Sequence, residues 1–365
     1  MSEVKTGRAF VDDPRGVWYL RRMLITIYGA GAIGGTTGAA LARAGRDVLL
    51  VDSHAGHVEA INTNGLTVER EGTATTTRVR AIEPAGLGRD LELVMLAVKS
   101  HHTMQALDEV APRLAPGGTI VSLQNGLSEE QIAERVGAAR TVGCLVNWAA
   151  DWVAPGRILH GGHGAFVLGE LDGKTTERVR GLAELLSVVE ATPVTDNIWG
   201  YKWAKLIYGA LLFATALVDA HVYEVVERSP GVKKALVGIV GEGMAVSDKA
   251  GVRLLPFDEF DPAWYRAAVA GDDAARDRAM AAIAAHYRAH TKTKTGIWRD
   301  LAVRKRKTEV DGQLGMIARK GEALGVATPL IRRLAELIRD LEDGRRQMDW
   351  PNLDPLVALA EGGRA

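Results

Sequence analysis

Cysteine is almost absent from the sequence, and neither charge is in excess. The single Cys144 excludes an internal disulfide and is typical of a protein in a reducing compartment. It lies in the apolar run 142–146, so we expect a buried, unreactive thiol. Lys and Arg together number 45 and so do Asp and Glu, which removes any global electrostatic case for binding nucleic acid or an anionic membrane.

Long hydrophobic runs are absent as well. No apolar stretch reaches the roughly 18 residues of a membrane-spanning helix, so no membrane span is predicted. Residues 1–22 contain no apolar core of signal-peptide length. We therefore interpret them as an N-terminal extension of a cytoplasmic protein and expect the fold to begin at Met23.

Complete metal-ligand sets are missing too. Six of the nine histidines occur in three pairs, which are His101 and His102, His160 and His163, and His286 and His290. No pair has the acidic or cysteine neighbours that would complete a set, so no metal site is predicted. The basic run 304–307 stands alone in a neutral chain, and we interpret it as a solvated helix end rather than a nucleic-acid surface.

A glycine-rich turn follows the first strand-like run of the chain. Its residues are Gly29, Ala30, Gly31, Ala32, Ile33 and Gly34. The first glycine permits the turn, the second lets backbone approach a pyrophosphate, and the third lets the next helix pack on the strand. Free N–H groups and the dipole at the helix start then favour phosphate. The pattern predicts a dinucleotide site.

The residue after the second strand bears on the cofactor. Residues 47–51 read as a strand that ends in Asp52, whose carboxylate suits the ribose 2′-hydroxyl of NAD and repels a 2′-phosphate. We therefore expect NAD as the preferred cofactor. NADP remains the alternative because Arg46 and His54 lie nearby.

Strands alternate with helices through the first half of the chain. Residues 91–98 form a near-continuous apolar run that ends at Lys99, which is typical of a buried parallel strand. Residues 119–123 form the next strand and precede Asn125. This alternation predicts a doubly wound α/β sheet, in which ligands bind beyond the carboxyl ends of the strands.

Helical periodicity dominates from residue 197 onward. We predict helices over residues 199–220, 231–250, 262–290, 303–324 and 329–342. The predicted organisation is an N-terminal extension (1–22), a Rossmann dinucleotide-binding domain (23–196), an all-helical substrate and dimerisation domain (197–345) and a C-terminal tail (346–365).

Five short motifs, taken in order, resemble those of the ketopantoate reductase (2-dehydropantoate 2-reductase) family. They are Gly29-Ala30-Gly31-Ala32-Ile33-Gly34, Ala97-Val98-Lys99, Gln124-Asn125-Gly126, Trp203-Ala204-Lys205-Leu206 and Lys307-Thr308-Glu309-Val310-Asp311. The resemblance covers residues 23–341. It implies a Rossmann domain, a helical domain and an active site in the cleft where they meet.

The resemblance also implies roles for single residues. Lys205 matches the general acid or base, Glu309 its carboxylate partner, and Lys99 and Asn125 the contacts to cofactor and substrate. The chemistry is suitable, because hydride delivery to a carbonyl leaves charge on oxygen that an ammonium both stabilises and protonates. From the residues alone, Lys202 competes with Lys205, and Asp311 competes with Glu309. A solvated surface lysine on an amphipathic helix is the other interpretation of Lys205.

The sequence departs from the family on the substrate side. Asparagines that the family usually carries four and eight positions after the lysine are Gly209 and Phe213 here. The family serine that meets the substrate carboxylate falls near Thr295 or Gly296, and Thr295 keeps the hydroxyl. These changes favour a divergent member with an altered substrate.

Five tryptophans lie in segments that the resemblance places near the cleft. They are Trp148, Trp152, Trp199, Trp203 and Trp298. They favour a larger or flatter substrate, although ordinary packing where domains meet explains them equally well. The insertion-like stretch 258–290 is interpreted as a wall, a lid or an oligomer contact.

The sequence as a whole predicts an NAD(P)-dependent oxidoreductase and a homodimer. Its reaction interconverts a 2-oxo acid, ketopantoate-like or larger, and the secondary alcohol. The alternatives are an NAD-linked dehydrogenase of a sugar acid or aromatic alcohol, and a non-catalytic dinucleotide-binding sensor.

Overall fold

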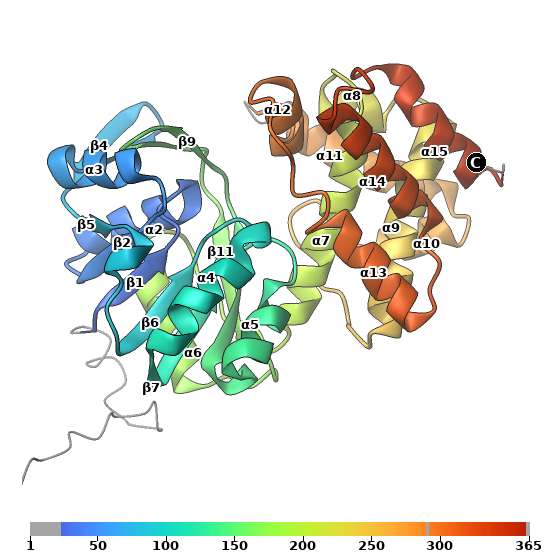
Figure 1. Cartoon of the computed structure of the whole chain (residues 1–365). Coiled ribbons are helices and arrows are strands. Elements are labelled where there is room, and N and C mark those ends of the chain that lie inside the picture. The colour runs from blue at the N-terminus through green and yellow to red at the C-terminus, as the bar shows by residue number, and fades with distance from the viewer. Residues whose placement is uncertain (1–22, 290–291, 363–365) are drawn as a thin grey trace, which may run out of the picture. The chain divides into compact units, whose positions relative to one another are not determined.

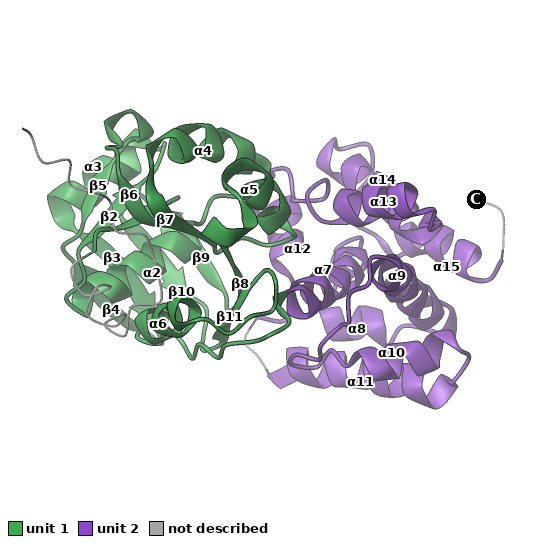
Figure 2. Ribbon diagram, turned by 90° about the horizontal axis from the view of Figure 1, so that it is seen from below, with its two compact units in different colours: residues 1–198 green, residues 199–365 purple. Residues whose placement is uncertain are grey.

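The computed structural model describes residues 23–289 and 292–362, and the predicted N-terminal extension lies outside them. The chain divides into two units, residues 1–198 and residues 199–365 (Figure 2). The first combines helices with a sheet of mostly parallel strands, and the second is helical. The predicted fold class, an α/β domain followed by an all-helical domain, is therefore confirmed.

The first unit is built on a seven-stranded sheet (Figure 1). In spatial order its strands are β11 (Ala165–Glu170), β8 (Thr141–Asn147), β7 (Leu114–Ser122), β6 (Leu91–Leu96), β1 (Ile25–Tyr28), β2 (Val48–Val51) and β5 (Arg80–Ile82). All neighbours are parallel except β11, which is antiparallel to β8. β1 has β2 on one side and β6 on the other, so the strand order reverses at β1. Sheets of this kind bind ligands at the carboxyl ends of the strands around such a point.

Two apolar cores cover the two faces of this sheet. One contains residues of α2 (Ala32–Arg43) and α6 (Glu177–Leu186), and the other contains residues of α4 (Thr103–Val110) and α5 (Ser128–Val136). In β6, Leu93 and Met95 join the first core, whereas Val94 and Leu96 join the second, because side chains alternate along a strand. The predicted burial of β6 on both faces is confirmed. The predicted burial of Cys144 in β8 is confirmed too.

A second, four-stranded sheet packs against α2. Its order is β4 (Thr73–Thr77), β3 (Leu66–Arg70), β10 (Arg157–His160) and β9 (Ala150–Ala154). The segment 73–82 contains two strands that belong to different sheets. Thr77 pairs with Leu66 in the second sheet, whereas Arg80 pairs with Leu49 in the main sheet, so the chain leaves one sheet for the other after Thr77.

The second unit consists of helices. They are α7 (Ile198–Thr215), α8 (Val222–Val226), α9 (Pro230–Lys249), α10 (Pro262–Val269), α11 (Asp273–Ala289), α12 (Gly296–Ala302), α13 (Leu314–Leu324), α14 (Pro329–Glu342), η5 (Trp350–Leu353) and α15 (Asp354–Ala360). None of the described helices is long and apolar enough to cross a membrane.

Two helix predictions in this unit are wrong in part. The segment 262–290 contains two helices because Gly271 adopts a φ of +101°, which ends α10, and Asp272 then accepts the N–H of Ala275 to begin α11. The predicted helix 303–324 begins only at Leu314. The chain turns directly after α12 instead, where the N–H of Arg306 donates to the carbonyl of Asp300 at 3.0 Å.

The segment after residue 345, predicted as a tail, packs into the helical unit. Leu353 and Leu356 are buried. Asn352 donates from Nδ2 to the carbonyl of Leu217 at 3.0 Å. Residues 350–360 are thus part of the unit, because η5 and α15 present apolar side chains to its core.

Glu242 on α9 binds the start of α14. Its carboxylate accepts the N–H groups of Leu330 and Ile331 at 2.8 and 2.9 Å. Burial raises the pKa of Glu242 from 4.5 to about 7, although these two hydrogen bonds act in the opposite direction. The folded state therefore binds this proton more tightly than the unfolded state does. The stabilisation is complete below the unfolded pKa and is lost as the pH rises to about 7.

We expect Glu242→Gln to remove this pH dependence. Relative to the variant, the free energy of unfolding of the wild type should fall by about 3 kcal/mol between about pH 4 and pH 8. Urea unfolding at a series of pH values measures the difference. Parallel pH profiles for the two proteins would contradict the assignment.

Candidate active site

The glycine turn follows β1 directly. Gly29 has a φ of +103°, and a Cβ there would lie 2.8 Å from the backbone of Ala97, just after β6. A Cβ on Gly34 would lie 2.0 Å from the carbonyl oxygen of Gly29. At Gly31, by contrast, a Cβ would meet nothing within 4 Å. Two glycines therefore permit close packing of the chain, and the third faces open space.

The beginning of α2 is suited to an anion. Gly31 precedes the helix and provides no side-chain cap, and the first turn contains no acidic residue. The first N–H groups of a helix have no partner within it and carry partial positive charge. Because Gly31 leaves space in front of them, a phosphate can approach these groups. This arrangement fits the pyrophosphate of a dinucleotide.

Two side chains that follow β2 hold Ala30, in the middle of the glycine turn. Asp52 accepts the N–H of Ala30 on Oδ2 and that of His54 on Oδ1, both at 2.9 Å. His57 contacts the carbonyl oxygen of Ala30 through Nε2 at 2.9 Å. The other ring nitrogen of His57, Nδ1, accepts the N–H of Gly156 at 2.9 Å. Because Nδ1 accepts this hydrogen bond, Nε2 is assigned as the donor to the carbonyl of Ala30.

His57 is not among the site residues predicted from the sequence. The residue lies on α3 (Ala55–Asn64), where it shares the buried face with Val58 and Ile61. A histidine among apolar positions of a helix face indicates a buried, hydrogen-bonded ring, and this was the available signal. Its partner Gly156 lies in the turn between β9 and β10, so His57 also connects the glycine turn to the second sheet.

We expect the effect of a His57 substitution on dinucleotide affinity to depend on which ring nitrogen the new side chain imitates. Glutamine retains a donor at the Nε2 end, whereas asparagine reaches only the Nδ1 end and leaves the carbonyl of Ala30 without its donor. The dissociation constant for NADH should rise about tenfold in His57→Asn and less in His57→Gln. Fluorescence titration with NADH measures the constants, with thermal unfolding as the control for folding. Equal affinities in all three proteins would contradict this role.

Lys99 and Asn125 lie at the same edge of the sheet as Gly29 and Asp52. They follow β6 and β7, which are parallel neighbours in the sheet, and both side chains are exposed. The buried Gln124 connects their loops, because its Nε2 donates to the carbonyl of Val98 at 2.9 Å. Gln124, the first residue of the Gln-Asn-Gly motif, thus holds the loop after β6 beside the loop after β7.

The helix α7 places the two candidate lysines differently. Lys202 is only 3 % exposed, whereas Lys205 and Gly209 are half-buried on one face. Phe213, by contrast, is fully buried, and its place in a substrate site stays a prediction. Eight residues make about 2.2 helical turns, which rotates Phe213 away from Lys205, and Leu212 lies on the accessible face instead.

The remaining candidates of the helical unit lie outside helix interiors. Glu309 is half-buried in the turn before α13 and not on a helix. Asp311, its competitor, forms an ion pair with Arg339 at 2.6 Å. Thr295 caps α12, because its Oγ1 accepts the N–H of Trp298 at 3.1 Å. The hydroxyl of Thr295 therefore has a structural role in the helical unit.

Three of the five tryptophans have packing roles. Trp203 is buried in the helical unit. In the first unit Trp148 stacks on His160, with ring centroids 5.0 Å apart. Trp298 donates from Nε1 to Asp219 at 2.9 Å. These contacts need no substrate to explain them.

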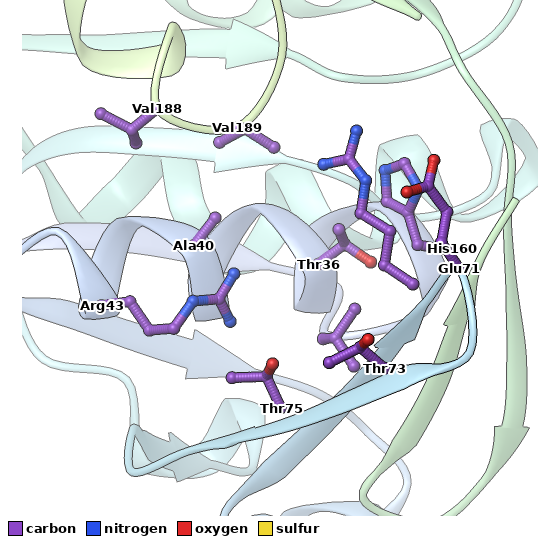
Figure 3. Close-up of a pocket in the computed structure, with 11 residues that line it drawn as sticks. Thr36, Ala40, Arg43, Glu71, Thr73, Thr75, His160, Val188 and Val189 are labelled. Atoms are coloured by element: carbon purple, nitrogen blue, oxygen red, sulfur yellow. The ribbon is translucent and has the colours of Figure 1, made fainter. Parts of the chain in front are cut away.

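A cavity of about 360 Å³ lies in the first unit beside α2 and the second sheet (Figure 3). Its wall includes Arg43 of α2, Arg70 and His160 of the second sheet, and Glu71 in the turn between β3 and β4. Arg70 pairs with the buried Glu190 at 2.7 Å. None of the candidate site residues lines this cavity, so it is separate from the glycine turn.

The histidine pairs have partners other than a metal. His286 lies 3.0 Å from Glu259, and His163 lies 3.4 Å from Glu71. His290 lies outside the described residues. Over residues 23–289 and 292–362, no group of three or more potential ligands is placed to hold a metal ion.

The reversal of strand order at β1, the glycine turn and Asp52 define a Rossmann-type dinucleotide-binding unit, here followed by a helical unit. Residues 25–173 match the family model described as ketopantoate reductase PanE/ApbA, and residues 197–342 match that of its C-terminal part. The chain belongs to the ketopantoate reductase family. Its members are oxidoreductases that act on CH–OH groups and bind a nicotinamide dinucleotide.

Relatives and solved structures agree with this assignment. A 2-dehydropantoate 2-reductase of Mesorhizobium japonicum is 31% identical over 344 residues, which cover 87% of this chain and 98% of that protein. A PanE/ApbA family ketopantoate reductase from Ralstonia eutropha is 29% identical, with a TM-score of 0.74 and coverage of 89% and 100%. A D-mandelate dehydrogenase solved with NADH and anilino(oxo)acetate is 24% identical, with a TM-score of 0.75 and coverage of 88% and 99%. The last comparison shows a shared fold.

Proposed function

We propose that the protein reduces a 2-oxo acid to its 2-hydroxy acid with a reduced nicotinamide dinucleotide, and that Lys205 is the general acid. The observation that carries the proposal is the contrast on α7. Lys202 is buried, whereas Lys205 lies on the accessible face. The resemblance of the Trp203-Ala204-Lys205-Leu206 motif to the family's supports the same choice. Family membership and the glycine turn support the cofactor.

The residues of this chain have separate tasks in the proposed reaction. When bound, the cofactor supplies a hydride to the carbonyl carbon. The ammonium of Lys205 stabilises the charge that develops on the carbonyl oxygen and donates the proton. Glu309 is the proposed carboxylate partner, and Lys99 and Asn125 position the substrate and the nicotinamide.

Asp52 supports NAD as the preferred cofactor. Its two hydrogen bonds to backbone N–H groups hold the carboxylate at the end of β2. In Rossmann units an acidic residue at this place binds the free ribose hydroxyl, whereas a 2′-phosphate would be repelled. We therefore propose that NADH serves better than NADPH.

Gly209 supports a substrate that differs from that of the reductases named for 2-dehydropantoate. It removes one of the asparagines expected beside the lysine, so we propose a ketopantoate-like or larger 2-oxo acid. No observation favours the sugar-acid, aromatic-alcohol or sensor alternatives. A cytoplasmic homodimer remains a prediction.

A panel of 2-oxo acids tested with NADH and with NADPH examines this function. Loss of reduced-nicotinamide absorbance measures turnover. We expect at least one 2-oxo acid to be reduced, with the higher kcat/KM for NADH. No turnover with any acid and either cofactor would refute the reductase function, and a clear preference for NADPH would refute the role of Asp52.

A further inference from the structure

The accessible face of α7 has a gap at Gly209. After the first turn of this helix, the half-buried residues are Tyr201, Lys205, Gly209 and Leu212, and the others are buried. Their spacings of four, four and three residues place them on one face. Gly209 therefore leaves an open position about 6 Å along the helix from Lys205.

Gln313 occupies the space beside Gly209. A Cβ on Gly209 would lie 3.1 Å from Oε1 of Gln313, the nearest atom outside the backbone of the helix. The backbone of Gln313 is held on both sides, because its N–H donates to the carbonyl of Glu309 at 2.9 Å and its carbonyl accepts the N–H of Ile317 at 3.2 Å. The side chain thus reaches α7 from a fixed turn, which also contains Glu309.

The carboxamide of Gln313 can bind the polar part of a substrate. Within the part of the chain that the structure describes, this side chain has no hydrogen-bond partner. Its Oε1, which is an acceptor, faces the helix position next to Lys205. A group bound by Oε1 must donate a hydrogen bond, as a hydroxyl does and a carboxylate does not.

We propose that Gln313 determines substrate specificity. Its Oε1 accepts a hydrogen bond from a hydroxyl on the carbon chain of the 2-oxo acid whose carbonyl oxygen binds Lys205. This inference rests on the proposed reductase function. Gly209 is required as well, because a side chain at this position would displace the carboxamide of Gln313.

Two substrates that differ by one hydroxyl test the proposal. The pair is ketopantoate and its counterpart without the hydroxyl or, if the panel selects a larger acid, that hydroxylated acid and its counterpart without the hydroxyl. Both acids are offered to the wild type and to Gln313→Leu, and kcat/KM is measured for each. We expect kcat/KM of the variant to fall at least about tenfold for the hydroxylated acid and to stay within about twofold for the other. When the side chain that accepts the hydroxyl's hydrogen bond is removed, the enzyme no longer distinguishes the acid with the hydroxyl from the acid without it.

A double variant moves the amide to the opposite element. Gly209→Asn combined with Gln313→Ala provides a carboxamide from α7 in the space that Gln313 vacates, and we expect it to regain part of the preference for the hydroxylated acid. The matched control is Gln347→Ala, at an exposed glutamine of the same unit, which should change neither value.

The outcomes separate the two proposals. If Gln313→Leu loses the same fraction of activity with both acids, or keeps wild-type activity with both, Gln313 does not determine specificity. The reductase function stands in either case. If the wild type reduces no 2-oxo acid of the panel, the reductase function fails and the role of Gln313 fails with it.

Discussion

Replacing Lys205 with alanine is expected to lower kcat by about 10²–10⁴-fold while NADH still binds with wild-type affinity. The ammonium is the proposed source of the proton, and no lysine of equal exposure lies within one turn, because Lys202 is buried. The proposed dinucleotide site lies in the other unit, so NADH affinity is expected not to depend on Lys205, and thermal unfolding is the control for folding of the helical unit. Steady-state kinetics and NADH titration test both parts.

Two further variants define what Lys205 contributes. Lys205→Arg keeps the positive charge but does not release a proton at neutral pH, so it should recover only a small part of the lost rate. Lys249→Ala removes an exposed lysine at the end of α9 and should behave as the wild type. If kcat of Lys205→Ala stays within about threefold of the wild-type value, Lys205 is not the acid.

The second large effect is expected at Gly34, with Gly31 as its matched partner. A methyl group on Gly34 would lie 2.0 Å from the carbonyl oxygen of Gly29, so backbone must move. We expect Gly34→Ala to lower the free energy of unfolding by about 3 kcal/mol. The same methyl group on Gly31 meets nothing within 4 Å, so Gly31→Ala should fold with a change of at most about 1 kcal/mol.

Gly31→Ala should bind NADH more weakly as a stable protein, whereas Gly34→Ala should first lose stability. In Gly31→Ala the methyl group enters the space in front of the first N–H groups of α2, and we expect the dissociation constant for NADH to rise about tenfold or more in a stable protein. Thermal unfolding and NADH titration on both variants separate stability from binding. Wild-type affinity in Gly31→Ala would contradict a pyrophosphate at this turn.

Local patterns were sufficient to predict much of the first unit. The apolar run of β6 predicted a strand buried on both faces because such a run has no polar side to expose. The glycine turn and Asp52 were also predictable from the sequence, because each belongs to a short motif of residues close together in the chain. His57 was not predictable in its role, because its hydrogen bonds join Ala30, His57 and Gly156, which are far apart in the chain.

The failures in the helical unit have physical causes. Phe213 lies eight residues after Lys205 and is buried, because seven residues, rather than eight, return closely to the same direction in a helix of 3.6 residues per turn. Glu309 was expected on a helix because helical periodicity was assigned to the whole segment 303–324, but the chain there turns before α13. The contact of Gln313 with Gly209 depends on tertiary packing and left no signal in the sequence.

The fate of the hydride tests the account most directly. The wild type is incubated with a 2-oxo acid and a reduced nicotinamide dinucleotide that carries deuterium at the transferred position, and the product is analysed by mass spectrometry. The account predicts a 2-hydroxy acid with one deuterium on the hydroxyl-bearing carbon, formed far more slowly by Lys205→Ala. A product without deuterium, or an unchanged oxo acid after oxidation of the cofactor, would contradict it.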